Sequence, residues 1–268
     1  MALRKPLLGL ATALHWFSND QAKAVAALYD AIRKVPLSAE TFQGILGSEV
    51  KNETLKLLTP EELAEQFPRM DHEDIHVKAK WNLYDRIVQG EEDAEKQQIL
   101  FSKWQSIERV RNCKALLLYA QRAFLNREFV DYDPSCVDIW EGWNRPWDYD
   151  HILTAATLNN NQGFRDQCKQ WANTIGNFRA WPLEKNRSRK NDVANNSITT
   201  KEELEDSLIR DKEECDAFSI DWKGVRDSQR VAAFLNAARD RMIRIYKDWF
   251  DSLEIGKLLQ RTSGRSQP

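Results

Sequence analysis

The chain has 268 residues, with 39 basic and 41 acidic side chains and a formal charge of −2. A chain of this size can bury a sizeable core, which argues against wholesale disorder. The balanced charge neither demands nor excludes a nucleic-acid partner, so any basic surface must be local. No apolar run approaches the ~20 residues of a membrane-spanning helix, and we expect no membrane partner.

The composition favours a mainly helical protein, because Lys, Glu, Ala and Leu are abundant and only 10 Gly and 8 Pro are present. The opening segment 1–17 is basic and then apolar but has no credible cleavage site, so we predict a helix rather than a signal peptide. Asn19 or Asp20 can cap the next helix, and Thr59-Pro60-Glu61-Glu62 forms a capping box. Helices are expected at 1–17, 22–35, from 60, from Asp71 to about 88, and over 91–129.

The residue composition changes in the segment 131–160, which is rich in aromatic and loop-forming residues. We predict strands at 147–153 and 177–181, a short helix near 163–173, a basic helical turn after Pro182 and a linker at 191–199. Helices return at 200–214 and 227–253, and the tail from about 257 is expected to be loose. The predicted fold class is mainly α with a small inserted strand–strand–helix unit, or α+β. The predicted domains are a helical region 1–135, the inserted unit 136–195 and a helical region 196–268.

The four cysteines, Cys113, Cys136, Cys168 and Cys215, are widely scattered and include no C-x-x-C pair. This excludes a zinc-ribbon framework and fits a reducing cytoplasm, where we expect the protein to reside.

The inserted unit carries the residues that suggest chemistry: Asp148, Asp150, His151, Asn177, Asn186, Arg187, Arg189 and Lys190. Hydrolysis of a phosphodiester needs a base for water, and a neutral histidine suits that task. It also needs charge stabilisation, which a divalent cation on carboxylate and amide oxygens can supply. Basic side chains can hold the flanking backbone.

The order Asp-His-Ile, Gly-Asn and Lys-Asn-Arg-x-x-Lys resembles the HNH, or ββα-metal, endonucleases. WDYDHIL followed by NTIGNFRAWPLEKNRSRKN is especially similar to the C-terminal nuclease domain of GmrSD-type restriction and phage-defence proteins, over about residues 144–191. The resemblance implies a ββα-metal unit and a Mg²⁺- or Mn²⁺-dependent endonuclease acting on DNA, in restriction or phage defence.

The resemblance also assigns roles within this unit. It implies His151 as general base, Asp150 and Asn186 as metal ligands, and Asn177 as the residue that orders the loop and orients the histidine. The expected nucleic-acid contacts are the basic residues Arg179, Lys185, Arg187, Arg189 and Lys190. In a regular strand Asp150 and His151 point to opposite faces, so either the strand ends or kinks at His151 or Asp148 shares in the metal shell.

Two features depart from the family pattern. Thr154 stands where the family usually has a proline, three residues after the histidine. The Asp-Gly-Gln-Gln-Arg string of the family's nucleotide-reading domain does not occur in this sequence, so we expect such a domain, or a separate regulatory subunit, as a partner.

The same residues are also compatible with functions other than a nuclease. The unit could be a catalytically silent scaffold that binds nucleic acid or a protein partner. Trp140, Trp143, Trp147 and Trp181 could stack on bases, although packing is the commoner role. His72-Glu73-Asp74-Ile75-His76 fits the H-E-x-x-H pattern of zinc proteases, but Asp71 to Asp74 also fits an acidic helix start.

Overall fold

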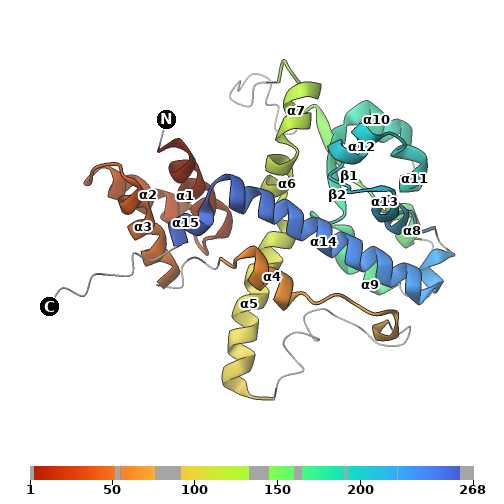
Figure 1. Ribbon diagram of the computed structural model, residues 1–268, viewed down its shortest axis with the longest axis horizontal. Coiled ribbons are helices and arrows are strands. Elements are labelled where there is room, and N and C mark those ends of the chain that lie inside the picture. The colour runs from red at the N-terminus through yellow and green to blue at the C-terminus, as the bar shows by residue number, and fades with distance from the viewer. Residues whose placement is uncertain are drawn as a thin grey trace. The chain divides into compact units, whose positions relative to one another are not determined.

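The computed structural model describes residues 3–51, 55, 57–75, 92–132, 145–159, 165–189, 192–221 and 223–259. Helices dominate this part of the chain, and its only sheet is one antiparallel pair of strands, which confirms the mainly helical class with a small β element (Figure 1). None of the described helices is long and apolar enough to cross a membrane.

The chain forms two compact units. Their boundaries differ from those of the predicted domains. The first unit comprises Met1–Gln66, Ile87–Val110 and Tyr246–Pro268, and the second comprises Phe67–Arg86 and Arg111–Ile245. The helices α5 (Ala94–Asn112) and α14 (Ser228–Ser252) each contribute residues to both units.

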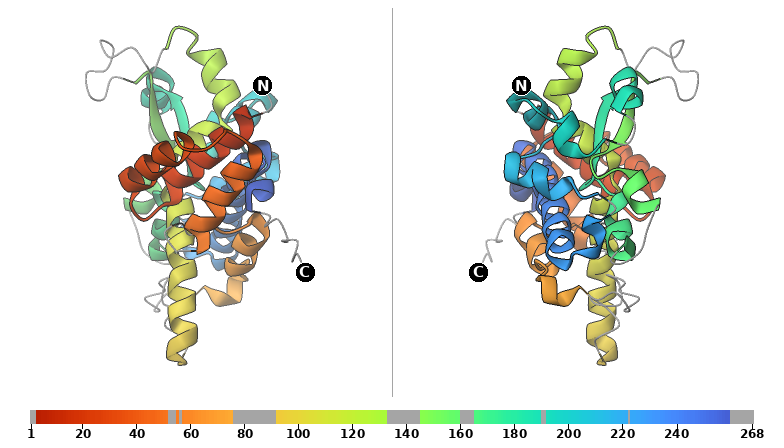
Figure 2. Two further views of the ribbon diagram at one scale, coloured as in Figure 1. Left: turned by 90° about the vertical axis from the view of Figure 1, so that its left-hand side faces the viewer. Right: turned by 90° about the vertical axis from the view of Figure 1, so that its right-hand side faces the viewer.

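The first unit is built on α1 (Arg4–Phe17), which packs against α2 (Gln21–Ile32), α3 (Ala39–Lys51) and α15 (Ile255–Leu259) (Figure 2). Its aromatic core forms where Phe17 contacts the rings of Tyr246 and Trp249, with centroids 5.9 and 5.1 Å away. The indole of Trp249 donates to Thr12 Oγ1 at 3.0 Å, so this buried polar group is satisfied.

The predicted helix starts of this unit are confirmed. Asp20 caps α2 by accepting a hydrogen bond from the backbone of Lys23 at 3.0 Å. At α4 (Pro60–Gln66), Thr59 and Glu62 exchange both bonds of a capping box. These signals are local, which is why the sequence alone reveals them.

The second unit holds the strands and most of the short helices. Its elements are η1 (His72–Asp74), α6 (Lys114–Ala120), α7 (Arg122–Glu128), β1 (Trp147–His151), α8 (Ala155–Asn159), α9 (Arg165–Ala172), β2 (Phe178–Pro182), α10 (Leu183–Arg189), α11 (Ala194–Ser197), α12 (Lys201–Asp206), α13 (Lys212–Phe218), η4 (Gly224–Arg226) and the first part of α14. The predicted strand pair followed by a helix is therefore present. The structure places η1 where a helix was expected to begin at Asp71; the rest of that prediction lies largely outside the described residues.

The prediction of a single helix over 91–129 is wrong. The helix is interrupted at Cys113 and again at Gln121, which leaves the three helices α5, α6 and α7. Gln121 is buried, and its side-chain amide bonds to the backbone N–H and carbonyl of Ala180 and to the carbonyl of Asp206. These partners lie far along the chain, so the break follows from tertiary contacts and not from a local signal.

The helix predicted over 200–214 is also two helices. Thr200 and Glu203 form the predicted capping box of α12. Leu208 then adopts a positive φ of 55°, which ends helical geometry, and Asp211 caps α13. The linker predicted at 191–199 contains α11, whose Ala194 is buried together with the following Ile198.

The segment before β2 is fixed by α14. Arg241 is fully buried and donates to the carbonyl oxygens of Ile175, Gly176 and Ser207. A Cβ atom at Gly176 would lie 2.4 Å from the carbonyl oxygen of Ala238, so only glycine permits this approach.

Cys113, Cys168 and Cys215 are free thiols. Cys168 is fully buried on α9, and burial raises the pKa of its thiol from an ordinary 9.0 to about 12. Between these pH values the unfolded chain loses a proton that the folded chain keeps, so the free energy of unfolding falls as pH rises above 9, by at most about 1.4 kcal/mol per pH unit.

We therefore expect Cys168→Ala to flatten the decline in stability above pH 9. Urea denaturation on either side of this pH measures the effect. Cys113→Ala is the comparison: burial also raises the pKa of that half-buried thiol, but less than for Cys168, so we expect a smaller flattening. Equal slopes for the wild type and the Cys168→Ala variant would contradict the assignment.

Candidate functional site

The candidate site is the hairpin of β1 and β2 together with α10, all within the second compact unit (Figure 1). In the antiparallel register Asp150 lies opposite Arg179, and His151 lies opposite Phe178. Because side chains alternate along a strand, one face carries Asp148, Asp150, Arg179 and Trp181, and the other carries Tyr149, His151, Phe178 and Ala180. We name the first the α10 face, since Arg189 of α10 reaches Asp150, and the second the His151 face.

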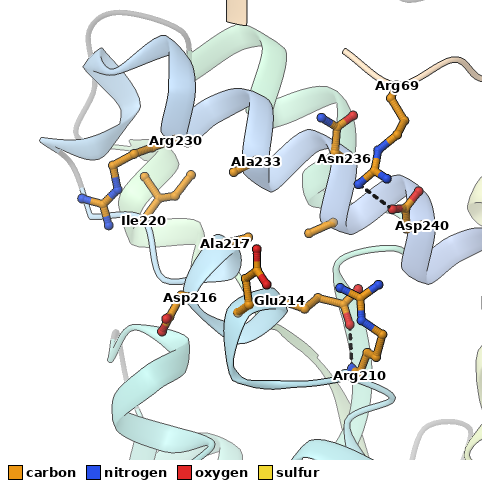
Figure 3. A pocket seen from close by; sticks show the side chains of 12 residues that line it. Arg69, Arg210, Glu214, Asp216, Ala217, Ile220, Arg230, Ala233, Asn236 and Asp240 are labelled. Atoms are coloured by element: carbon orange, nitrogen blue, oxygen red, sulfur yellow. Dashed lines mark hydrogen bonds and ion pairs between the residues drawn. The ribbon is translucent and has the colours of Figure 1, made fainter. Parts of the chain in front are cut away.

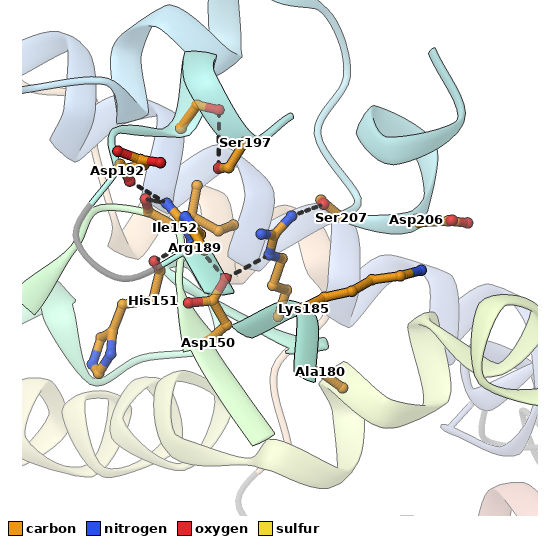
Figure 4. A network of polar contacts seen from close by, with 12 residues as sticks. Asp150, His151, Ile152, Ala180, Lys185, Arg189, Asp192, Ser197, Asp206 and Ser207 are labelled. Atoms are coloured by element: carbon orange, nitrogen blue, oxygen red, sulfur yellow. Dashed lines mark hydrogen bonds and ion pairs between the residues drawn. The ribbon is translucent and has the colours of Figure 1, made fainter. Parts of the chain in front are cut away.

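The α10 face holds a buried ion cluster (Figure 4). Arg179 Nε and Arg189 Nη1 both donate to Asp150 Oδ2, at 2.9 and 2.5 Å. All three side chains are buried, and that of Arg179 is 0% exposed. One carboxylate thus compensates two guanidinium groups, which are permanent cations at neutral pH.

Arg189 also joins α10 to the end of β1. Its guanidinium donates to the carbonyl oxygens of His151, Ile152 and Asp192, at 2.9, 2.7 and 3.2 Å. Both Arg179 and Arg189 are buried and are held by partners within the protein, so this structure gives no support to their predicted contact with nucleic acid.

The donor set does not fit a divalent cation. The Asp150 carboxylate lies between two buried positive charges, which repel any metal ion brought to it. The described residues contain no group of three or more His, Cys, Asp or Glu side chains able to hold a metal. The expected role of Asp150 as a ligand of Mg²⁺ or Mn²⁺ is thus not met in this arrangement, because its charge is already compensated.

His151 lies on the other side of the hairpin, away from the cluster around Asp150 and Arg189 (Figure 4). β1 ends at His151, as one of the expected alternatives requires, but pairing is regular up to this residue and the strand does not kink before it. The ring is half-buried; Nε2 lies 3.0 Å from Asn173 Oδ1, and the ring centroid lies 4.6 Å from that of Phe178. The structure therefore does not bring the Asp150 carboxylate and the His151 ring to one point.

Asn177 connects the turn after β1 to the segment before β2. It is 0% exposed; its Oδ1 accepts from the N–H of Leu153 at 2.8 Å, and its Nδ2 donates to the carbonyls of Leu153 and Ala172. The N–H of Ile152 donates to the backbone carbonyl of Asn177 at 2.9 Å. Asn177 thus fixes the chain immediately after His151, and its expected part in a reaction stays a prediction.

The departure at Thr154 has a local structural explanation. Thr154 is buried directly before α8, and its hydroxyl lies 3.2 Å from that of Thr157. Thr157 in turn donates to the carbonyl of Ile220 at 3.1 Å. A threonine therefore makes side-chain contacts here that a proline could not make.

The remaining predicted site residues are more exposed. Asp148 and Asn186 are half-buried, and in the described part of the chain no hydrogen bond joins Asn186 to Asp150 or His151. Arg187 is exposed, and so is Lys185, whose ammonium group pairs with Glu128 at 2.9 Å. Lys190 lies outside the described residues.

The His151 face carries cations that the sequence did not single out. Lys114 Nζ lies 4.5 Å from the centre of the Tyr149 ring and 5.2 Å from that of Phe178. The guanidinium carbon of Arg145 lies 4.6 Å from the same Tyr149 ring. No ion pair with an acidic residue is found for either cation within the ranges that the structure describes. Lys114 is the first residue of α6, and both α6 and α7 precede β1, so no local pattern could have identified it.

Two other sequence candidates lose support. Trp147 and Trp181 are buried, and Trp181 stacks on Phe124 with centroids 5.2 Å apart, so neither is free to stack on bases. Trp140 and Trp143 lie outside the described residues. His72 belongs to the three-residue η1 and pairs with Asp71 at 2.6 Å, which differs from the long helix of a zinc protease; His76 lies outside the described part.

The second unit also contains a polar cavity of about 390 Å³, lined in part by Arg69, Arg210, Glu214 and Asp240 (Figure 3). Charges of both signs line it, and several are paired within the protein: Arg69 with Asp240 at 3.0 Å, Arg210 with Asp211 at 2.6 Å, and Glu214 with Arg244 at 2.7 Å. These internal pairs leave no single sign of charge with which to select a ligand.

Comparison with family models, with curated proteins and with solved structures finds no match to this chain.

Proposed function

We propose that the His151 face of the hairpin binds the phosphodiester backbone of nucleic acid, with DNA as the partner. The observation that carries this proposal is the pair of cations, Lys114 and Arg145, on the Tyr149 ring beside His151. Phosphate contacts from Lys and Arg supply most of the affinity of proteins for nucleic-acid backbones.

The surroundings of these cations favour an anionic ligand. Tyr149 is positioned by β1 and Phe178 by β2, so the two cations are arranged over a rigid hairpin rather than on a flexible loop. Lys114 lies at the exposed start of α6, and Arg145 is half-buried just before β1. Such a surface recognises the charge and shape of the backbone and carries no base-specific readout of its own.

Cleavage of the bound strand is the second candidate function. It is favoured by the order β1, β2 and α10, with Asn177 fixing the turn behind a half-buried His151. With Asn173 Oδ1 as its partner, Nε2 of His151 carries the proton, and Nδ1 is left to accept one from water. This candidate corresponds to the HNH endonuclease of restriction or phage defence, and any Mg²⁺ or Mn²⁺ that it used would have to be held without the Asp150 carboxylate, which already pairs with Arg179 and Arg189.

Binding is tested by fluorescence anisotropy with a labelled DNA duplex in the presence of EDTA. We expect Lys114→Gln with Arg145→Gln to weaken binding roughly tenfold or more and to reduce the slope of log affinity against log salt by about two. Lys201→Gln with Lys212→Gln is the matched control, because it also removes two positive charges, from exposed side chains of α12 and α13 that pair with Glu205 and Asp216. Equal affinities for the double variant and the control would contradict the proposed surface.

Cleavage is tested separately with supercoiled plasmid and Mg²⁺ or Mn²⁺. The binding proposal expects no nicking by the wild type. Nicking that is lost in both His151→Ala and Asn186→Ala would establish the second candidate instead, and nicking that persists in both would assign the activity to another site or to a contaminant.

A further inference from the structure

The ion cluster on the α10 face has an excess of buried positive charge at the position where the resemblance places a metal. Arg179 lies directly opposite Asp150 in the hairpin and donates from Nε to its carboxylate at 2.9 Å. Its Nη1 donates to Ser207 Oγ at 2.8 Å, and its guanidinium carbon lies 4.0 Å from the Trp181 ring. Arg179 Nη2 and Arg189 Nε are buried donors without a hydrogen-bond partner in the described structure.

We infer that the guanidinium of Arg179 takes the place beside Asp150 that the resemblance gives to a divalent cation, so that this hairpin and helix assemble without a metal ion. A guanidinium group supplies a fixed positive charge and directional donors, and a metal ion in that place would have to displace Arg179. This inference concerns the α10 face and does not rest on the proposed binding at the His151 face.

Arg179 stays charged under ordinary conditions. Burial lowers its pKa to about 10, and the negative charge of Asp150 opposes that decrease. The group is therefore protonated at neutral pH. Arg189 adds a second positive charge and Glu203 a distant negative one, so the surroundings of the Asp150 carboxylate remain unfavourable to a further cation.

Replacing Arg179 should disturb the fold less than replacing Arg189. Arg189 donates to the carbonyl oxygens of His151 and Ile152 at the end of β1 and to that of Asp192 just after α10, so its removal disturbs the fold as well as the charge. Beyond Asp150, Arg179 makes a single side-chain hydrogen bond, to Ser207. Methionine matches much of its length and contributes no charge.

The test measures binding of Mn²⁺ alone to the full chain, by electron paramagnetic resonance of the free ion and by titration calorimetry. We expect no bound Mn²⁺ in the wild type, one site in Arg179→Met, and loss of that site when Asp150→Asn is added. Arg179→Lys is the matched control that keeps the positive charge, and we expect it to bind no Mn²⁺. Circular dichroism checks that each variant is folded.

Two results would overturn the inference. One is stoichiometric Mn²⁺ binding by the wild type that is lost in Asp150→Asn, a comparison that needs no change at Arg179. The other is a folded Arg179→Met that binds no Mn²⁺, which would show that Arg179 is not what excludes the metal. Neither result depends on whether DNA binds, so failure of the proposed function remains distinguishable.

Discussion

Replacing Asp150 with alanine is expected to lower the free energy of unfolding by about 3 to 5 kcal/mol. The change removes the carboxylate that Arg179 and Arg189 share, and it leaves two guanidinium groups buried without a counter-ion. Removing one partner of a buried ion pair is costly because the remaining charge is no longer solvated by water or by protein. Urea denaturation followed by circular dichroism measures the loss.

Asp148→Ala is the matched control for this experiment. Asp148 lies two residues earlier on the same face and is half-buried, and no ion pair of it is found among the described residues. We expect its replacement to change stability by less than about 0.5 kcal/mol. Combining Asp150→Leu with Arg179→Met should recover part of the loss, since a charge and its counter-charge are removed together. Equal losses for Asp148→Ala and Asp150→Ala would rule out the structural role of the cluster.

Replacing Asn177 with alanine is expected to destabilise the protein by about 2 to 4 kcal/mol. The substitution leaves the N–H of Leu153 and the carbonyls of Leu153 and Ala172 without the partner that the buried amide provides. Asn177→Asp should be at least as harmful, because it sets a carboxylate against two carbonyl oxygens. The measurement is again the free energy of unfolding in urea.

Asn173→Ala provides the comparison, since Asn173 is an exposed asparagine in the same segment. We expect a loss of no more than about 0.5 kcal/mol, although its contact with the His151 ring disappears. If Asn177→Ala were as mild as Asn173→Ala, the buried amide would not be what holds the turn after β1.

The sequence predicts the elements whose signals are local. Asp20 and the Thr59–Glu62 capping box mark helix starts because the cap and its partner lie within three residues of each other. The breaks at Cys113, Gln121 and Leu208 escape prediction. At Gln121 the helix is interrupted, and the Gln121 side chain forms hydrogen bonds with the backbone of Ala180 and Asp206. These residues are close to Gln121 only in the folded chain.

The candidate site shows the same division. The order of two strands and a helix follows from patterns in residues 147–189. That Asp150 faces Arg179 depends on a strand register joining positions 29 residues apart, which composition and spacing do not determine. The basic run from Lys185 suggested one exposed surface, but helical geometry turns Arg189 inward while Lys185 and Arg187 remain outside.

The side chain of Gln121 limits the addition of another chain to the outer edge of β2. A two-stranded sheet normally leaves unpaired backbone groups along its outer edges, to which an extended peptide or another copy can add by β-augmentation. At Ala180 the Gln121 amide accepts from the N–H at 2.7 Å and donates to the carbonyl at 3.2 Å, as a neighbouring strand would. The middle of β2 is thus already capped, and a third strand cannot extend the hairpin there without displacing a buried glutamine.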